Sequence, residues 1–555
     1  MDTYKTEPGG KQKLRERNPK WLNDDYVKFI RMGQDYIERA KVGILAYINP
    51  HGFLDNPTFR GMRWSLWTTF DTLFVLDLHG NTRRQEMAKD GSKDENIFQI
   101  MQGIAINVFL KTKETNRTYG TLYHHELYGS AQKKCRFLAE QFMGTVPWNA
   151  LLPLTECFSY HFMIPKDVSK VVSYTKGFSL IDLFRTQPNT RANVLSVGLI
   201  SGWDGMFIDM RAEMLKKRFE DLRRYDVDKL AEMYPTFRSK KQKLRSLKSI
   251  CQNKEEMAIY PIHYRPFDVR YVLYDRDLLV RPQYAVMRHF LRDNVGLVFS
   301  RTVNGAYNWQ DIQITRHLVE FGIMATRVGN AAPVAPLFVY ERGERISNLS
   351  QAVVSQMAEM LAVKVDILSD RSGRGDKLTS WDILDYVLAI LHSNRYRRIY
   401  EELLKIDYPR VPYPEDADTF WALVEQGKEL RNILLLTFED AQRTSPTLRN
   451  KDGRIIPKSE EIAYVRPCSQ GNENWNGKVW INERQYFEGI SQAAWNFYIG
   501  GYKPAQKWLK DRKKTRSVPG RALRSEEVTH YGKMIRALEE TMGVMEKIDR
   551  ILPLD

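Results

Sequence analysis

The chain has few cysteines, and they lie far apart. Its 555 residues include 4 cysteines, Cys135, Cys157, Cys251 and Cys468, and none of them forms a Cys-x-x-Cys pair. Zinc ribbons and disulfide scaffolds depend on regularly spaced cysteines, so this pattern disfavours both classes. Isolated cysteines are typical of proteins in a reducing compartment, and we therefore expect a cytoplasmic protein.

Long hydrophobic runs are also missing. No apolar stretch reaches the roughly 20 residues that a membrane-spanning helix needs. The first residues, MDTYKTEPGGKQKLRERNPK, contain no apolar segment of the kind that forms the centre of a signal peptide. Both observations favour a protein that does not enter a membrane.

Several sequence motifs of catalysis are absent. The chain contains no GxxxxGK[ST], GxGxxG or HExxH, which argues against a phosphate-binding loop, a dinucleotide fingerprint and a zinc protease site. Its 10 histidines include one adjacent pair, His124-His125, which we expect on a strand or a loop surface. Carboxylates such as Asp77 at a strand end can act as bases, but such acids are common in any α/β sheet. Spacing alone predicts no enzyme.

Positive charge, in contrast, is abundant. There are 84 Lys and Arg residues against 68 Asp and Glu, which gives a formal net charge of +16. A surplus of this size favours a polyanionic partner, most commonly nucleic acid. A basic surface without a partner remains the alternative.

Arginines alternate with aromatic residues in the stretch from Tyr260 to Tyr340. Asp268–Tyr274 has the period-two pattern of a half-buried strand, Arg281-Pro282 opens a helical segment, and Val295–Ser300 forms a second strand. Guanidinium groups and flat rings together suit phosphates and base edges. The alternative is an ordinary α/β core with a solvated basic rim. We predict double-stranded DNA as the partner, contacted by Arg265, Arg270, Arg276, Arg281, Tyr284, Arg288, Arg301, Lys510 and Arg512.

The first third of the chain alternates helices and strands. We expect a helix after an N-cap at Asn23 or Asp24, a second helix at 58–68, and strands at 43–48, 72–78 and 104–111. The run Gly43–Ile48 is continuously apolar, as in a strand inside a parallel sheet. This order is typical of a doubly wound α/β domain. No strand precedes the first helix, so a sheet of so few strands is not expected to be stable alone.

Longer blocks carry a family resemblance. Four blocks resemble the adenine-specific DNA methyltransferase of type ISP restriction–modification enzymes: Asn18–Arg31, Leu54–Arg63, Leu76–Asn81 and Asp90–Asn96. Others resemble the C-terminal target-recognition domain of that family: Tyr264–Asp268, Arg281-Pro282 with Met287 and His289, Tyr408–Pro412, Gln485–Gly489, Ile499–Tyr502 and Trp508–Arg512. The resemblance covers nearly the whole chain.

The resemblance implies an α/β fold with a partial Rossmann-like methyltransferase sheet, followed by a mixed α/β target-recognition domain with a helical C-terminus. We predict four segments in this order. They are a flexible lead-in at 1–17, the C-terminal half of a methyltransferase-like domain at 18–160, the first part of the recognition domain at 161–345, and its helical and aromatic-rich remainder at 346–555. The last segment includes a predicted helix at 381–405 and a long closing helix at 525–551.

The chain also departs from the family. Such enzymes carry a nuclease, a helicase motor, a Gly-rich S-adenosylmethionine loop and an Asn-Pro-Pro-Tyr loop, and none of these is found in the 555 residues. Asn49-Pro50-His51 follows an apolar strand but lacks the second proline and the aromatic residue that stacks on a flipped base. We interpret it as a turn after a later strand. The resemblance places Phe109 near the base pocket, although a core phenylalanine is the alternative, and no catalytic or cofactor-binding residue is assigned.

Two hypotheses follow. In the first, the chain is the C-terminal part of a type ISP-like enzyme, and it recognises DNA sequence in support of S-adenosylmethionine-dependent adenine methylation. An upstream-encoded chain would supply the nuclease, the helicase, the cofactor loop and the Asn-Pro-Pro-Tyr loop. In the second, it is a non-catalytic DNA-binding or specificity protein, or a truncated remnant.

Overall fold

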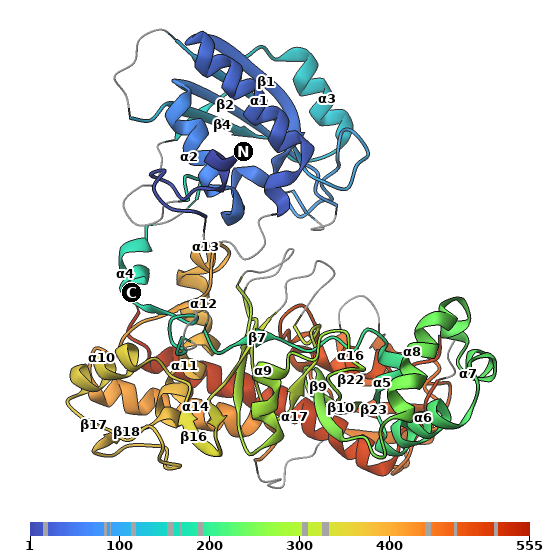
Figure 1. The fold of residues 1–555 in the computed structure, drawn as a ribbon. Coiled ribbons are helices and arrows are strands. Elements are labelled where there is room, and N and C mark those ends of the chain that lie inside the picture. Colours follow the sequence, from blue (N-terminus) through green and yellow to red (C-terminus); the bar gives the residue numbers. More distant parts are fainter. Residues whose placement is uncertain are drawn as a thin grey trace. The chain divides into compact units, whose positions relative to one another are not determined.

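The computed structural model describes the chain apart from 15–19, 83–85, 89, 113–117, 152–159, 167–168, 187–192, 302–308, 325–331, 439–445, 471–473, 516–519 and 555. The chain divides into two compact units (Figure 1). Unit 1 comprises Met1–Lys176 with Asn304–Asn308 and Glu402–Asp407, and unit 2 comprises Gly177–Val303, Trp309–Glu401 and Tyr408–Asp555. The division falls after residue 176, whereas the sequence predicted boundaries at 160 and 345. Within the described residues, no helix is both long and apolar enough to cross a lipid bilayer.

The helices of unit 1 follow the sequence pattern closely. Helix α1 (Asp25–Ala40) begins after Asp24, one of the two predicted N-caps, and is followed by Lys41 in a left-handed conformation with φ 64°. Helix α2 is Arg60–Thr69. The hydroxyl of Tyr4, in the 3-10 helix η1 (Asp2–Lys5), donates a 2.6 Å hydrogen bond to Gln34 of α1, and its ring is fully buried. The predicted flexible lead-in therefore packs on the core at Tyr4, with Met1 and Leu14 beside it, whereas 9–13 are exposed and 15–17 lie outside the described residues.

Five strands of unit 1 form one sheet in the order β1-β3-β2-β4-β5. These strands are β1 (Gly43–Pro50), β2 (Thr72–His79), β3 (Ile104–Lys111), β4 (Thr121–Glu126) and β5 (Asn149–Leu151). Strand β3 lies antiparallel to both β1 and β2, whereas β2 and β4 are parallel. The expectation of a purely parallel arrangement is therefore wrong at β3. No helix lies in the described residues between β2 and β3, and a parallel return needs a crossover connection, usually helical.

Strand β1 is at the edge of this sheet, and the prediction of an interior strand is wrong as well. Leu45 is buried, but the side chains of Ile44 and Ile48 are exposed. A run of apolar residues on both faces is usual for strands that are covered on both sides. Among the described residues of unit 1, only one side of β1 is covered, which is the side that α1 packs against.

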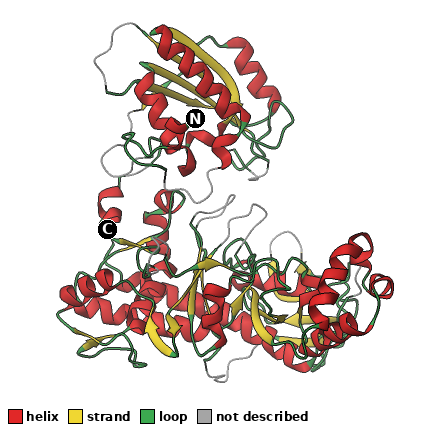
Figure 2. Ribbon diagram, in the orientation of Figure 1, coloured by secondary structure: helices red, strands yellow, loops and turns green. Residues whose placement is uncertain are grey.

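Unit 2 contains three four-stranded sheets (Figure 2). One has the order β13-β9-β10-β8, with β8 (Ile208–Asp209), β9 (Ile259–Arg265), β10 (Asp268–Leu273) and β13 (Leu318–Val319). A second has the order β12-β11-β14-β7, with β7 (Ser196–Val197), β11 (Gly296–Phe299), β12 (Ile312–Thr315) and β14 (Pro333–Pro336). The third has the order β20-β23-β22-β21, with β20 (Thr447–Asn450), β21 (Arg466–Gln470), β22 (Asn474–Trp480) and β23 (Gln485–Glu488).

Helices connect these parts of unit 2. The predicted helix at 381–405 is interrupted after α11 (Ser380–His392), because Ser393 caps a new helix, α12 (Asn394–Ile399), by accepting a hydrogen bond from the Tyr396 amide. Helix α17 (Ser525–Ile551) has the predicted bounds. It packs against α11, α12 and α14 (Ala417–Leu434) and also against α15 (Gln492–Asn496) and α16 (Pro504–Lys510), so it joins the helical and the aromatic-rich parts of the unit.

Candidate functional site

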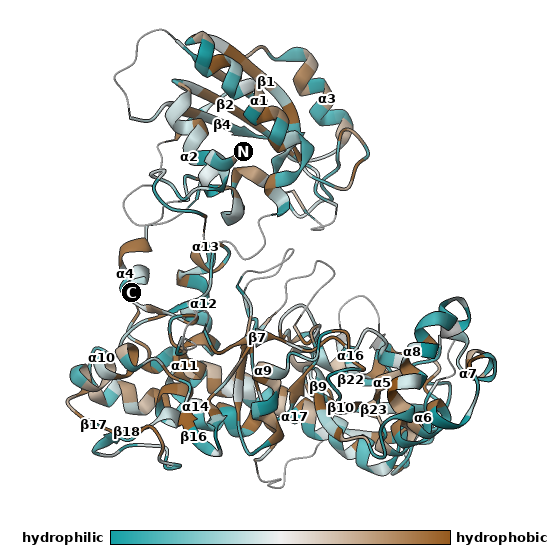
Figure 3. Ribbon diagram, viewed as in Figure 1, coloured by the Kyte–Doolittle hydropathy of each residue, from teal (hydrophilic) through white to brown (hydrophobic). Residues whose placement is uncertain are grey.

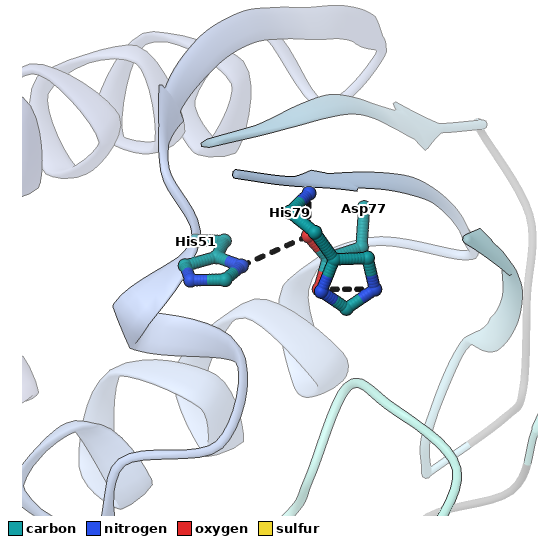
Figure 4. Close-up of side chains that lie close together, drawn as sticks. All are labelled: His51, Asp77 and His79. Carbon is teal, nitrogen blue, oxygen red and sulfur yellow. Dashed lines mark hydrogen bonds and ion pairs between the residues drawn. The ribbon is translucent and has the colours of Figure 1, made fainter. Parts of the chain in front are cut away.

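Three side chains meet at one end of the sheet of unit 1. Strand β1 ends at Pro50 and continues into η3 (His51–Leu54), while β2 ends at His79. Both Pro50 and His79 pair with Ile104 of β3, so the two strand ends lie on either side of the same residue. This pairing brings together His51, Asp77 and His79 (Figure 4). His51 Nδ1 lies 2.9 Å from Asp77 Oδ1, and His79 Nε2 lies 3.8 Å from Asp77 Oδ2.

Two more carboxylates complete this histidine–carboxylate cluster. Glu86 Oε1 lies 2.8 Å from His79 Nδ1, and Glu126 Oε2 lies 3.4 Å from His79 Nε2. The ring of Tyr128 stacks on the His79 ring at 3.9 Å between centroids. His79 is therefore enclosed by three carboxylates and an aromatic face.

The carboxylates favour the charged form of both histidines. Burial lowers the pKa of His79, but Glu126, Glu86 and Asp77 outweigh it and raise the value to about 10. Burial also lowers the pKa of His51, and Asp77 and Glu86 reverse this, so the net pKa is raised. Burial raises the pKa of Asp77, but the two histidines lower it to about 2. At neutral pH the cluster therefore holds a protonated His79 between ionised carboxylates.

Raising the pH from 7 to 10 is expected to lower the free energy of unfolding of unit 1. Folded His79 keeps its proton up to about pH 10, whereas an unfolded histidine releases it near 6.5. Protonated His79 therefore makes its full contribution to the free energy of unfolding below pH 6.5. Above pH 6.5 that free energy falls by up to about 1.4 kcal/mol per pH unit. His79→Gln should make this slope smaller, leaving only the part that comes from the raised pKa of His51, in urea unfolding followed by hydrogen exchange of β2 amides. An equal slope in the variant would show that His79 is neutral in the folded state.

The cluster has two chemical capacities. His51, Asp77 and His79 each offer a ligand atom, and these atoms lie within 4.8 Å of one another, so they could hold a divalent ion that histidine and carboxylate suit, such as Zn²⁺ or Fe²⁺. A metal would first have to displace the proton of His79. Without a metal, the charged pairs fix the ends of β1 and β2 against each other.

A small cavity of about 150 Å³ lies on the sheet of unit 1, lined mainly by apolar side chains that include Phe74, Val108 and Trp148. Asn49 lies in β1, and its side-chain oxygen accepts a 2.8 Å hydrogen bond from Asn107, so this amide is used inside the sheet.

The sequence indicated only part of this cluster. The sequence pointed to Asp77 at a strand end, but His79, Glu86 and Glu126 were not singled out. The predicted turn at Asn49-Pro50 is wrong, because both residues lie in β1 and His51 follows them. The available signal was the short spacing Asp77-Leu-His79 at the end of β2, but the sequence does not reveal that the register with β3 shifts between Asp77 and His79 or that His79 has φ 50°. Phe109 is buried in the core beside Phe70, with ring centroids 5.5 Å apart. His124, predicted on a surface, is buried in β4.

Three of the nine residues predicted to contact DNA form buried ion pairs in unit 2. Arg265 pairs with Glu320, and its guanidinium lies 4.0 Å from the Tyr264 ring centroid. Asp268, only 2% exposed, accepts from Arg270 at 2.7 Å and from Arg512 at 3.0 Å. These arginines hold β9, β10 and the end of α16 together. Their assignment to a DNA interface stays a prediction.

Four of the nine residues predicted to contact DNA are exposed between β10 and β11: Arg276, Arg281, Tyr284 and Arg288. Arg276 stacks on Tyr284, with its guanidinium 4.5 Å from the ring centroid, and Arg281 and Arg288 are exposed on the same segment. We call residues 276–288 the arginine segment. Its backbone is anchored because Arg281 and Ile200 exchange two hydrogen bonds of 2.9 and 3.0 Å.

The last two residues predicted to contact DNA, Lys510 and Arg301, lie elsewhere in unit 2. Lys510 is exposed at the end of α16, and burial together with Lys503, Lys513 and Lys507 lowers its pKa. Arg301 is half-buried, with its guanidinium 5.9 Å from the Tyr408 ring centroid. The lysines around Lys510 repel one another, and a bound phosphate would relieve that repulsion.

Solved structures of three DNA complexes are similar to this chain. The first is an ATP-dependent type ISP restriction–modification enzyme, LlaBIII, bound to DNA, with 17% identity, a TM-score of 0.70, and coverage of 96% of this chain and 34% of that chain. The second is a complex of DrdV with DNA, with 18% identity and a TM-score of 0.69. The match covers 98% of this chain and 53% of that chain. The third is a nuclease-deletion mutant of the type ISP restriction–modification enzyme LlaGI in complex with a DNA substrate mimic, with 17% identity and a TM-score of 0.64. The match covers 96% of this chain and 41% of that chain.

At these identities the similarity shows a shared fold. Nearly all of this chain matches, but it spans only between a third and about half of the length of each of these chains. No curated protein matches the chain. Residues 193–547 match the family described as the type ISP C-terminal specificity domain. The chain therefore belongs to the type ISP restriction–modification family, as its sequence blocks predicted.

Proposed function

We propose that unit 2 recognises a sequence in double-stranded DNA on behalf of a type ISP restriction–modification system. The observation that carries this proposal is the match of 193–547 to the type ISP specificity domain. The three similar structures are complexes with DNA or with a DNA mimic, which supports the same partner. The net charge of +16 suits binding to a polyanion.

The arginine segment is the best candidate for the DNA contact. Its guanidinium groups are exposed, and the Arg276–Tyr284 stack presents a flat cationic surface on a backbone that is fixed to Ile200. The guanidinium group of an arginine can donate two hydrogen bonds to the acceptor atoms of a guanine edge or to the oxygens of a phosphate. Lys510 and its neighbouring lysines form a second, separate candidate.

We propose further that this recognition supports methylation of adenine by S-adenosylmethionine. Unit 1 resembles the later part of a methyltransferase sheet, but the 555 residues contain neither the Gly-rich cofactor loop nor an Asn-Pro-Pro-Tyr loop. Another polypeptide would therefore supply both loops. The alternative is a specificity protein without catalysis, and the missing cofactor loop is the observation that favours it.

Calorimetry on the purified chain separates these possibilities. We expect binding to duplex DNA and no heat of binding with S-adenosylmethionine, because the Gly-rich cofactor loop is missing from these 555 residues. The DNA affinity should fall steeply with salt, in proportion to the number of phosphates contacted. Binding of S-adenosylmethionine by the chain alone would contradict the need for another polypeptide. Absence of DNA binding would contradict the recognition function itself.

A further inference from the structure

An apolar surface of unit 1 is open to solvent around β1. Six large hydrophobic side chains there are between 44% and 66% exposed, although contiguous apolar patches are rare on soluble proteins unless they bind something. We call them the edge surface: Phe29, Met32 and Tyr36 on α1, Val42 in the connection, and Ile44 and Ile48 on β1. Figure 3 shows brown, hydrophobic segments along both α1 and β1.

The two parts of the edge surface lie on opposite faces of the sheet and meet at the free edge of β1, since α1 covers the face of Leu45 whereas Ile44 and Ile48 belong to the other face. Helix α1 lies on β1 so closely that a side chain at Gly33 would meet Leu45 at 2.3 Å, and the Tyr47 hydroxyl donates to the Phe29 carbonyl at 3.3 Å. Gln34 instead faces α2, where it donates to Ser65 and Thr69. Phe29 and Tyr36 lie one turn on either side of Gly33, so the apolar stripe is on the side of α1 next to β1 and away from α2.

The backbone of β1 is also free on one side. In the described residues β1 pairs only with β3, over eight residues without a register shift. Alternate residues of an edge strand direct their N–H and C=O groups outward, and natural proteins usually protect such edges with charges, bulges or very short strands. The sequence of β1, GILAYINP, contains no charge, and its one proline is the last residue.

One face of the sheet is incompletely covered at the same place. Ile44, Ala46 and Ile48 are in register with Leu110, Val108 and Ile106 of β3, so they share a face. Helix α3 (Ala131–Glu140) and Trp148 cover this face beside Phe74 and Leu76 of β2, as the lining of the small cavity shows. This cover does not extend to Ile44 and Ile48, which stay exposed.

We propose that a different polypeptide segment, outside these 555 residues, adds a β-strand to β1 and packs apolar side chains on the edge surface. Addition of a strand to an exposed edge is an established mode of recognition, in which the backbone gives affinity and side chains give specificity. The similar structures favour a different segment over a second copy, because this chain accounts for only 34% to 53% of their length. The identity of that segment as the cofactor-bearing half rests on the proposed function.

The test is co-expression of this chain with the polypeptide encoded directly upstream of it. We expect the two to co-purify and the β1 amides to exchange more slowly in the complex than in the chain alone. The double variant Ile44→Lys/Ile48→Lys places two charges in the proposed contact and should weaken association at least about 30-fold. Lysine is well tolerated on exposed edge strands, so the variant should still fold.

Met360→Lys is the matched control, because Met360 is 48% exposed on α10 (Gln351–Leu361) in unit 2. It should leave association unchanged, and both lysine variants should bind DNA as the unmodified chain does. Lack of association between the unmodified chains overturns the proposal. So does a homodimer in sedimentation that the double variant abolishes, since a second copy then occupies the edge. Association without DNA binding leaves the edge contact standing and removes the recognition function.

Discussion

Asp268→Ala is expected to destabilise unit 2 by about 3–5 kcal/mol. Asp268 is almost fully buried and accepts hydrogen bonds from both Arg270 and Arg512, and the side chain of Arg512 is itself only 4% exposed. Removal of the carboxylate leaves a buried guanidinium without its main partner, which is far more costly than the loss of an exposed pair. Although burial alone would raise the pKa of Asp268, Arg512 and Arg270 hold it well below its usual range.

The measurement is urea unfolding followed by hydrogen exchange of the β9 and β10 amides, because two compact units need not unfold together. Asp277→Ala is the matched control, since the Asp277 side chain is 69% exposed and lies 3.4 Å from Lys254. We expect that control to change stability by no more than about 0.5 kcal/mol. An equally small effect of Asp268→Ala would show that the buried pairs contribute little to folding.

The sequence predicted the elements with regular periodicity well. Helix α17 has the bounds that its pattern gave, and α1 begins after its predicted cap, because amphipathic spacing and capping residues are local properties. The sequence did not predict that β3 runs antiparallel between β1 and β2. Pairing direction depends on how the connection from β2 returns to the sheet, and residues 80–103 carry no periodicity that reveals it.

In the candidate sites, too, the sequence indicated single residues but not the contacts that they make. Asp77 was visible as a carboxylate at a strand end, but its contact with His51 arises because β1 and β2 both end beside Ile104. Arg270 and Arg281 looked alike in the sequence, as arginines among aromatic residues. Only the fold separates them, since Arg270 is bound to Asp268 whereas Arg281 is exposed. Composition therefore does not separate the buried arginines of unit 2 from the exposed ones.

Replacing Arg276, Arg281 and Arg288 together by Ala is expected to weaken DNA binding strongly and to lower its dependence on salt. Each arginine that neutralises a phosphate contributes about 1 to the slope of log K against log salt, so the triple variant should lose up to about 3. An arginine that reads a base edge instead costs about 1–3 kcal/mol, roughly 5- to 150-fold in affinity. Because these three side chains are exposed, the variant should keep the stability of unit 2.

The measurement is a titration of duplex DNA over a series of salt concentrations. Arg454→Ala is the matched control, because the Arg454 side chain is 84% exposed in the same unit and pairs weakly with Asp452 at 3.5 Å. An unchanged slope in the triple variant would remove the arginine segment from the interface. Arg270→Ala gives the complementary result, since its loss should lower stability through Asp268 before it changes the salt slope. A smaller slope for Arg270→Ala at full stability would instead place that buried arginine at the DNA.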